Sequence, residues 1–232
     1  MTSSGPKLIN WMILTAALVA VVVLTPIYYV AGRVVGLSKE FWDVFSCTST
    51  VAVAIVIGYQ LFFVVQFATL QRQARVISSP LDTRIPFVAG WVWVYGGIYY
   101  GLIGIPVVFL EKSGGCFELI IGGFILLLLI SPIYLLFPTV CPQEWRRFEV
   151  HDFSGRFLRF IQSFDNGRTC LPSLHCVLAA YSTSFLPISP LSLLIPILVS
   201  ISCVLVKQHS VSDILPSLVL GFLWGFFVKV MF

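Results

Sequence analysis

The chain has 232 residues, of which 58% are hydrophobic and only 10% are charged. Soluble domains carry about 25% charged residues, so this composition indicates an integral membrane protein and argues against a soluble enzyme. The formal net charge of +4 gives no argument for nucleic acid as a partner, because bilayer headgroups account for basic residues between membrane spans.

Long uncharged stretches recur along the chain, and a helix needs roughly 20 apolar residues to cross a bilayer core. They predict spans at residues 8–31, 44–70, 86–110, 119–137, 172–187, 191–206 and 214–228. The fold is therefore expected to be an all-α, polytopic membrane bundle of about seven transmembrane helices.

The whole chain, 1–232, is expected to form a single membrane domain. Its parts are a first span and link (1–43), spans two to four (44–137), a polar active-site loop (138–171) and the catalytic spans five to seven (172–232). A polar loop as long as 138–171 is often functional.

The six cysteines fall into apolar and polar surroundings. Cys47, Cys176 and Cys203 lie in apolar stretches, where we interpret them as small buried hydrophobic residues. Cys141 and Cys170 flank one polar loop, and they could pair if that loop faces an oxidising compartment.

Two polar clusters, residues 164–175 and 207–213, enclose an apolar insert without any Asp, Glu, Lys or Arg. Such an insert predicts a helical hairpin that leaves the membrane surface and returns to it, so both clusters lie on one side of the bilayer. Two of the three histidines, His175 and His209, belong to these clusters. Ionisable residues beside a span are costly and often functional, so we expect the chemistry here.

His209 and Asp213 are four residues apart, which places them on one face of a helix. A carboxylate there can accept a hydrogen bond from one imidazole nitrogen and leave the other nitrogen as a nucleophile or base. The alternative is a capped helix start in which Asp213 binds backbone N–H groups. The spacing alone does not decide between them.

The segment from Pro172 to His175 is expected to open a helix, whose free N–H groups make a natural anion site. The Ser173 hydroxyl would add a donor, and His175 could protonate a leaving oxygen as a general acid. The alternative for His175 is an interfacial histidine that only hydrogen-bonds lipid or backbone.

Basic side chains near the clusters could neutralise a phosphate, because phosphoryl transfer is catalysed largely by positioning and charge stabilisation. The candidates are Arg168, Lys207, Arg146 and Arg147. For most arginines of the loop, contact with anionic headgroups is the preferred alternative. Arg168 is the exception, because it lies only seven residues before His175.

Together, Pro172-Ser173-x-His175 and His209-x-x-x-Asp213 resemble the motifs of the type-2 phosphatidic acid phosphatase superfamily. That superfamily includes lipid phosphate phosphatases and the inositol phosphorylceramide and sphingomyelin synthases. The inositolphosphotransferase-like branch is the more similar, through Cys170-Leu171 before Pro172, Gln208 before His209, Leu81-Asp82-x-Arg84-Ile85-Pro86-Phe87 and Phe137-Pro138-Thr139. The resemblance covers roughly residues 80 to 225.

The resemblance implies a six-helix phosphatase-like core and a site that uses neither metal nor cofactor. It implies that His209 attacks phosphorus, that Asp213 orients His209, and that His175 protonates the leaving alcohol. Ser173 and its helix N-terminus would hold the phosphoryl oxygens. The family's arginine six residues before the second histidine is replaced here by Cys203, so Lys207 and Arg168 are the candidates to substitute for it.

The expected function is a lipid phosphate phosphatase that works through a phosphohistidine, with a lipid phosphate and the bilayer as its partners. One alternative is a phosphotransferase that moves a phospho-headgroup between lipids, as inositol phosphorylceramide or sphingomyelin synthases do. A second alternative, from another class, is a non-catalytic protein that binds or carries a lipid phosphate.

The resemblance implies a site on the lumenal or periplasmic face, whereas the positive-inside rule taken literally makes that face cytoplasmic. The predicted face carries ten of the 14 basic residues, but five of the ten belong to the loop expected to handle phosphate. Without those five the two faces carry similar charge, and we expect a multi-pass protein with a lumenal or periplasmic site.

Overall fold

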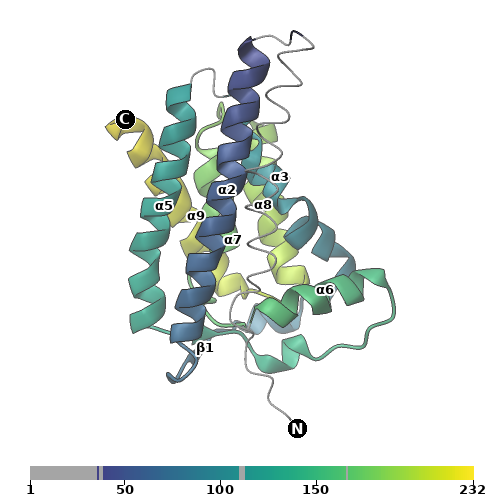
Figure 1. Ribbon diagram of the computed structural model, residues 1–232. Helices are drawn as coiled ribbons and strands as arrows, with labels where there is room; N and C mark the ends of the chain where they lie inside the picture. Colours follow the sequence, from purple (N-terminus) through teal and green to yellow (C-terminus); the bar gives the residue numbers. More distant parts are fainter. Residues whose placement is uncertain (1–35, 37–38, 110–112, 166) are drawn as a thin grey trace.

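The computed structural model describes residues 36, 39–109, 113–165 and 167–232, and this part of the chain is helical apart from one very small sheet (Figure 1). The longer helices are α2 (Lys39–Ala68), α5 (Ser113–Leu136), α6 (Phe153–Phe164), α7 (Leu174–Thr183), α8 (Pro190–Leu205) and α9 (Val211–Met231). Shorter helices are α3 (Tyr99–Gly104) and α4 (Pro106–Phe109), with 3-10 turns at Pro80–Thr83, Ala89–Trp91 and Gln143–Arg146 and a π-helical turn at Trp93–Ile98.

Three helices of the described part are long and apolar enough to cross a membrane: Phe41–Ala68, Gly115–Leu136 and Val211–Met231. They coincide with three of the predicted spans, so an all-helical chain with helices of membrane-spanning length is confirmed. The predicted first span, 8–31, lies outside the described residues.

The other predicted spans are not single long helices. Within the predicted span 86–110, the described residues 86–109 form a succession of short helical pieces, and Pro106 begins a new piece because it has no N–H for the preceding turn. Helices α7 and α8 have 10 and 16 residues, fewer than the roughly 20 that a span needs. The predicted polar loop 138–171 is also not purely a loop, because it contains the amphipathic helix α6, which Asp152 caps by accepting from the Gly155 N–H at 2.7 Å.

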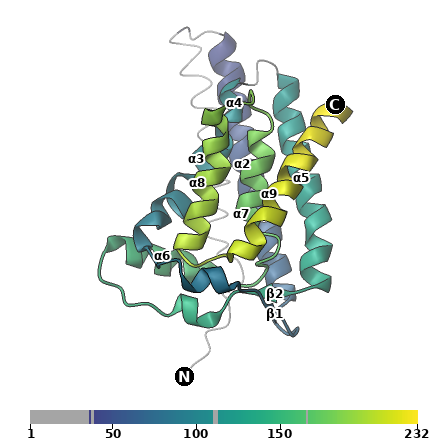
Figure 2. The same cartoon turned by 180° about the vertical axis from the view of Figure 1, so that it is seen from behind.

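Helix α7 occupies the centre of the fold, where it packs against α5, α8 and α9 (Figure 2). Eight of its ten residues are buried. Its side chains enter two apolar clusters, one with α5 and α9 and one with α3 and α8. The first cluster includes Leu126, Ile130, Tyr134, Val177 and Val228, and the second includes Val92, Tyr99, Cys176, Val199 and Val206. Because α7 begins at the two polar clusters, its burial fixes the site's position relative to the bundle.

Helices α7 and α9 approach so closely that two positions of α9 require glycine. A Cβ on Gly221 would lie 2.3 Å from the Val177 carbonyl oxygen, and one on Gly225 would lie 1.9 Å from the Ser184 Oγ. Small residues spaced by four are the common means of bringing membrane helices into contact.

We therefore expect Gly221→Ala to force α7 and α9 apart and to lower the free energy of unfolding by about 1–3 kcal/mol, as overpacking does. Thermal unfolding in detergent measures this effect. Gly101→Ala in α3 is the matched control, since a Cβ there meets no atom within 4 Å. An equal midpoint for the two variants would contradict the prediction.

The small sheet gathers three distant segments at one end of the bundle. Strand β1 (Arg75–Val76) pairs in parallel with β2 (Thr139–Val140), and Val140 also bridges to Arg168. Residues 71–84 and 138–171 therefore lie side by side at this end of the bundle. The Thr169 N–H donates to the Thr139 carbonyl at 2.9 Å, which holds the segment before α7 in place.

Candidate active site

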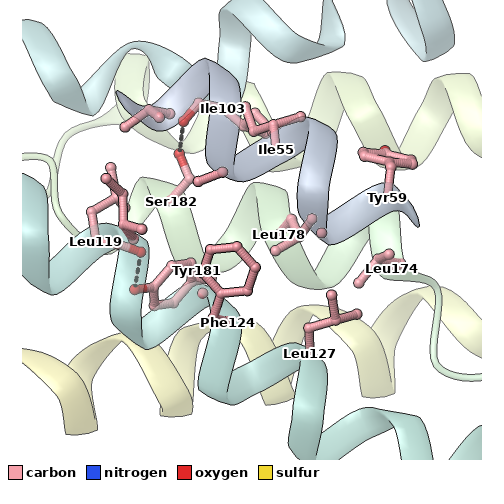
Figure 3. A pocket seen from close by; sticks show the side chains of 15 residues that line it. Ile55, Tyr59, Ile103, Leu119, Phe124, Leu127, Leu174, Leu178, Tyr181 and Ser182 are labelled. Carbon is pink, nitrogen blue, oxygen red and sulfur yellow. Dashed lines mark hydrogen bonds between the residues drawn. The ribbon is translucent and has the colours of Figure 1, made fainter. Parts of the chain in front are cut away.

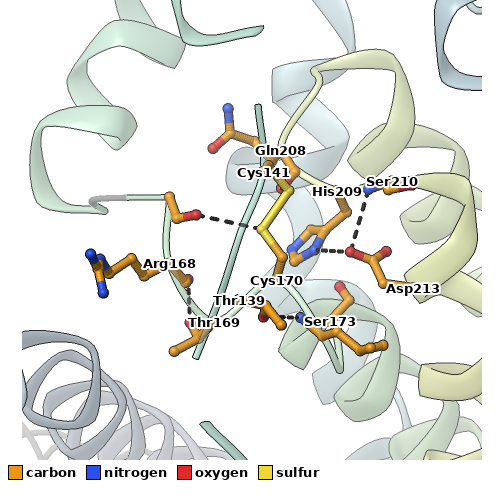
Figure 4. The surroundings of a disulfide bond; sticks show 12 residues. Thr139, Cys141, Arg168, Thr169, Cys170, Ser173, Gln208, His209, Ser210 and Asp213 are labelled. Atoms are coloured by element: carbon orange, nitrogen blue, oxygen red, sulfur yellow. Dashed lines mark hydrogen bonds and ion pairs between the residues drawn. A yellow bond between two sulfur atoms is a disulfide. The ribbon is translucent and has the colours of Figure 1, made fainter. Parts of the chain in front are cut away.

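The start of α9 brings His209 and Asp213 together. The Asp213 Oδ2 lies 3.2 Å from the His209 Nδ1 and accepts from the Ser210 N–H at 3.3 Å (Figure 4). Both interpretations of the four-residue spacing are therefore realised by one carboxylate, which caps the helix and pairs with the imidazole. With Nδ1 engaged, Nε2 is the nitrogen available to a substrate.

His175 lies across from His209, with 6.0 Å between the ring centroids. It is held by aromatic rings, since its centroid lies 4.3 Å from that of Tyr95 and 4.7 Å from that of Tyr99. Tyr95 comes from the π-helical turn Trp93–Ile98, so this interruption of the helix supplies one wall of the site. The predicted juxtaposition of the two histidines is confirmed.

The electrostatics of the pair favour a protonated His209. Burial of the ring acts to lower its pKa, but the charge and hydrogen bond of Asp213, together with smaller contributions from Cys176 and Asp165, outweigh burial. The net result is a His209 pKa raised above the ordinary value of 6.5. The raised pKa favours the cationic form of the ring, which attracts a substrate with negative charge.

A cavity of about 770 Å³ opens beside the histidines, and both of them line it. Small-molecule sites have about 300–1,000 Å³, so the volume suits a ligand. The polar end is lined by His175, His209, Gln208, Thr169 and Arg168. The remaining wall is mostly apolar and comes largely from α2 and α6, with Val56, Phe63, Phe67, Phe157 and Ile161 among its residues. The cavity is thus amphipathic, with ionisable groups at one end.

Two of the predicted phosphate ligands are committed to backbone carbonyls. Arg168 lines the cavity, but its Nη1 donates to the carbonyl oxygens of Thr69 and Arg72. The Lys207 Nζ donates to the carbonyls of Asp82 at 2.6 Å and Ile85 at 2.7 Å. Both cations therefore hold loops around the site, and a direct contact with phosphate stays a prediction for them.

The other predicted ligands are placed differently. The Arg146 Nη2 donates to the Gln162 carbonyl at 2.9 Å, and its Nη1 lies 3.4 Å from the Gln208 Oε1, beside the site. Arg147 is exposed and does not line the cavity. Ser173 is fully buried and caps α7 with its Oγ, so its hydroxyl supports the helix N-terminus.

Asp82 is a site component that the sequence interpretation did not assign. It is 2% exposed, and its Oδ2 accepts from the Ser210 Oγ at 2.6 Å while its Oδ1 accepts from the Val211 N–H at 2.9 Å. Its Oδ2 also accepts from the Ser79 N–H at 2.6 Å. The S-x-x-D pattern from Ser79 to Asp82 signals a local cap, but not the second contact 128 residues away.

Gln66 is a second unassigned component, and it fastens α2 to the loop before α7. Its Nε2 donates to the Asp165 Oδ1 at 2.8 Å and to the Arg168 carbonyl at 2.9 Å. The side chain is 2% exposed. Because Gln66 and Asp165 both line the cavity, this bond connects its apolar wall to its polar end.

Two disulfides join distant segments of the described chain. Cys141 and Cys170 are bonded beside His209, with 6.1 Å between their Cα atoms (Figure 4). The interpretation of Cys47 as only a small buried hydrophobic residue is wrong, since it is bonded to Cys116 and ties α2 to α5. Cys176 and Cys203 are free and buried, as expected.

Comparisons of the chain with protein-family models, with curated proteins and with solved structures find no match.

Proposed function

We propose that the protein is a membrane-embedded lipid phosphate phosphatase that works through a phosphohistidine on His209. The observation that carries this proposal is the His209–Asp213 pair opposite His175, at the polar end of an otherwise apolar cavity. A lipid phosphate has the same division into an anionic head and an apolar tail. The motif resemblance described above supports the same chemistry.

In the proposed reaction the His209 Nε2 attacks phosphorus and the bond from phosphorus to the ester oxygen breaks. Asp213 keeps the proton on Nδ1 and stabilises the positive charge that develops on the ring. His175 gives a proton to the leaving alcohol and then takes one from the water that hydrolyses the phosphohistidine. The products are inorganic phosphate, the alcohol and regenerated His209.

The acceptor is the open step of this scheme, because a lipid or polyol hydroxyl could replace water on the same phosphohistidine. The enzyme would then be a phosphotransferase. The geometry of the two histidines serves both reactions equally, so the products have to be identified by experiment.

The predicted lumenal or periplasmic face is supported by the motif resemblance alone. The disulfides do not choose a face, because they lie at opposite ends of the bundle: Cys141–Cys170 lies near β2, whereas Cys47–Cys116 joins the N-terminal parts of α2 and α5 (Figure 1).

The deciding experiment measures release of inorganic phosphate from a panel of lipid phosphates by the purified protein in detergent containing a chelator. Release, together with an acid-labile and base-stable phosphoenzyme after rapid quenching, is the expected result. No release from any member, but transfer of label to an added lipid alcohol, would replace the phosphatase by a phosphotransferase. Tight binding without either reaction would replace it by a lipid-phosphate carrier.

The raised pKa of His209 predicts the position of the acidic limb in the pH profile of kcat/KM. Attack requires the neutral ring, so activity should rise as the pH rises through the His209 pKa, which lies above 6.5. Asp213→Asn removes the charge that raises the pKa and leaves burial, which lowers it. We therefore expect the acidic limb of the residual Asp213→Asn activity to lie at a lower pH than that of the wild type. A limb that stays in place would contradict this assignment.

A further inference from the structure

A second cavity, of about 100 Å³, lies between α2, α5 and α7 (Figure 3). Its wall is mostly apolar, and two of the hydroxyl groups that line it, those of Ser182 and Tyr181, are turned to backbone carbonyls. The Ser182 Oγ donates to the Ile103 carbonyl at 2.7 Å, and the Tyr181 hydroxyl donates to the Leu119 carbonyl at 2.8 Å. Apolar hollows in proteins take up apolar molecules; an enclosed one of roughly 150 Å³ binds benzene.

The small cavity adjoins the large one that contains the histidines. Ile55, Tyr59 and Leu174 line both cavities. Leu174 immediately precedes His175, so this shared wall starts next to the catalytic groups and continues along α2. A hydrocarbon chain that leaves the polar end along α2 would have to pass Tyr59 to reach the small cavity.

Two glycines keep the small cavity open. Gly58 of α2 and Gly123 of α5 both line it, and a Cβ on either would make only ordinary contacts of 3.6 Å, with Leu127 and Tyr181. Close helix packing therefore does not require glycine at these two positions, in contrast to Gly221. Larger side chains there would occupy the cavity instead of separating the helices.

We propose that this cavity binds the far end of the substrate's hydrocarbon chain and so selects lipid phosphates by chain length. The proposal rests on the proposed function for the identity of the substrate. It assigns Gly58 and Gly123 as specificity-determining residues: with a phosphate at His209, the tail follows α2 past Tyr59 and its last carbons fill the space between α2, α5 and α7.

The test uses an alkyl phosphate that carries a photoreactive diazirine at the end of a hexadecyl chain, with the cross-linked peptides mapped by mass spectrometry. We expect adducts on the α2 and α5 residues that line the small cavity. Gly123→Leu and Gly58→Leu, which fill it from different helices, should each remove these adducts. Gly101→Leu is the control, because its Cβ meets no atom within 4 Å and it lines neither cavity.

Turnover provides the second measurement. Gly123→Leu should lower the ratio of kcat/KM for hexadecyl phosphate to that for hexyl phosphate by about tenfold, the discrimination that an apolar pocket makes for a single methylene. Hydrolysis of hexyl phosphate by the variant shows that it is folded and active.

The two measurements separate this inference from the proposed function. The subsite would be overturned by adducts confined to other surfaces, or by an unchanged ratio of kcat/KM for hexadecyl to hexyl phosphate in both leucine variants. Hydrolysis of hexyl phosphate would still support the phosphatase in either case. If the wild type hydrolyses neither ester, the phosphatase fails, and the position of the adducts still decides the subsite because labelling requires binding alone.

Discussion

Replacing His209 with glutamine is expected to reduce phosphate release by at least about 10⁴-fold, the order of loss seen when a nucleophile is removed from a catalytic unit. Glutamine retains a donor for Asp213, which is fully buried and needs a partner for its carboxylate. The variant should therefore fold with a thermal midpoint close to that of the wild type. Wild-type activity at an unchanged midpoint would eliminate the phosphohistidine mechanism.

His175→Gln separates the two histidine roles. For an alkyl phosphate the leaving alcohol needs a proton, so loss of a general acid should cost about 10²–10⁴-fold. For 4-nitrophenyl phosphate, whose leaving group needs no proton, the loss should be much smaller. His209→Gln should abolish both reactions equally. An equal loss with both esters in His175→Gln would mean that His175 acts by holding the cavity wall with Tyr95 and Tyr99.

The sequence predicted the long helices and the pairing of the histidines because both depend on signals that local composition carries. Uncharged stretches identify α2, α5 and α9 directly. The apolar insert between two polar clusters returns the chain to its starting side, which brings His175 and His209 within 6.0 Å of each other. The continuity of the helices was not predicted correctly. The apolar composition of residues 86–110 indicates burial, but it does not show that the described part of this segment divides into short helices, one of which begins at Pro106.

The roles of Arg168 and Lys207 could not be predicted, because the sequence shows that they are charged but not which groups their side chains contact. Arg168 and Lys207 lie within the predicted clusters, yet both donate to carbonyl oxygens of loops that are distant in the sequence. The bond between Cys47 and Cys116 spans 69 residues, and two cysteines in separate apolar stretches give no information about their distance.

Replacing Asp82 is also expected to have a large effect. Its carboxylate accepts from Ser210 and Val211 at the start of α9, between His209 and Asp213. In Asp82→Asn one acceptor becomes an NH₂ group that faces other donors, so hydrogen bonds to a buried charge are lost and the helix start shifts. We expect kcat to fall by about 10²-fold, as for comparable misplacement of catalytic groups, with a smaller change in KM.

A positioning role for Asp82 differs measurably from a purely structural one. If Asp82 orients the helix start, Asp213 moves relative to His209 in Asp82→Asn, and the acidic limb of kcat/KM shifts to lower pH because the raising charge is farther away. If Asp82 only stabilises the fold, fewer molecules are active, and the size of the phosphoenzyme burst measures their number. Those active molecules should then show the wild-type kcat and an acidic limb at the wild-type pH. Asp43→Asn, at an exposed site on α2, removes the same charge and should leave kcat and the limb unchanged. A shifted limb in Asp82→Asn, with none in Asp43→Asn, would mean that Asp82 sets the geometry of the His209–Asp213 pair from a loop more than a hundred residues earlier in the chain.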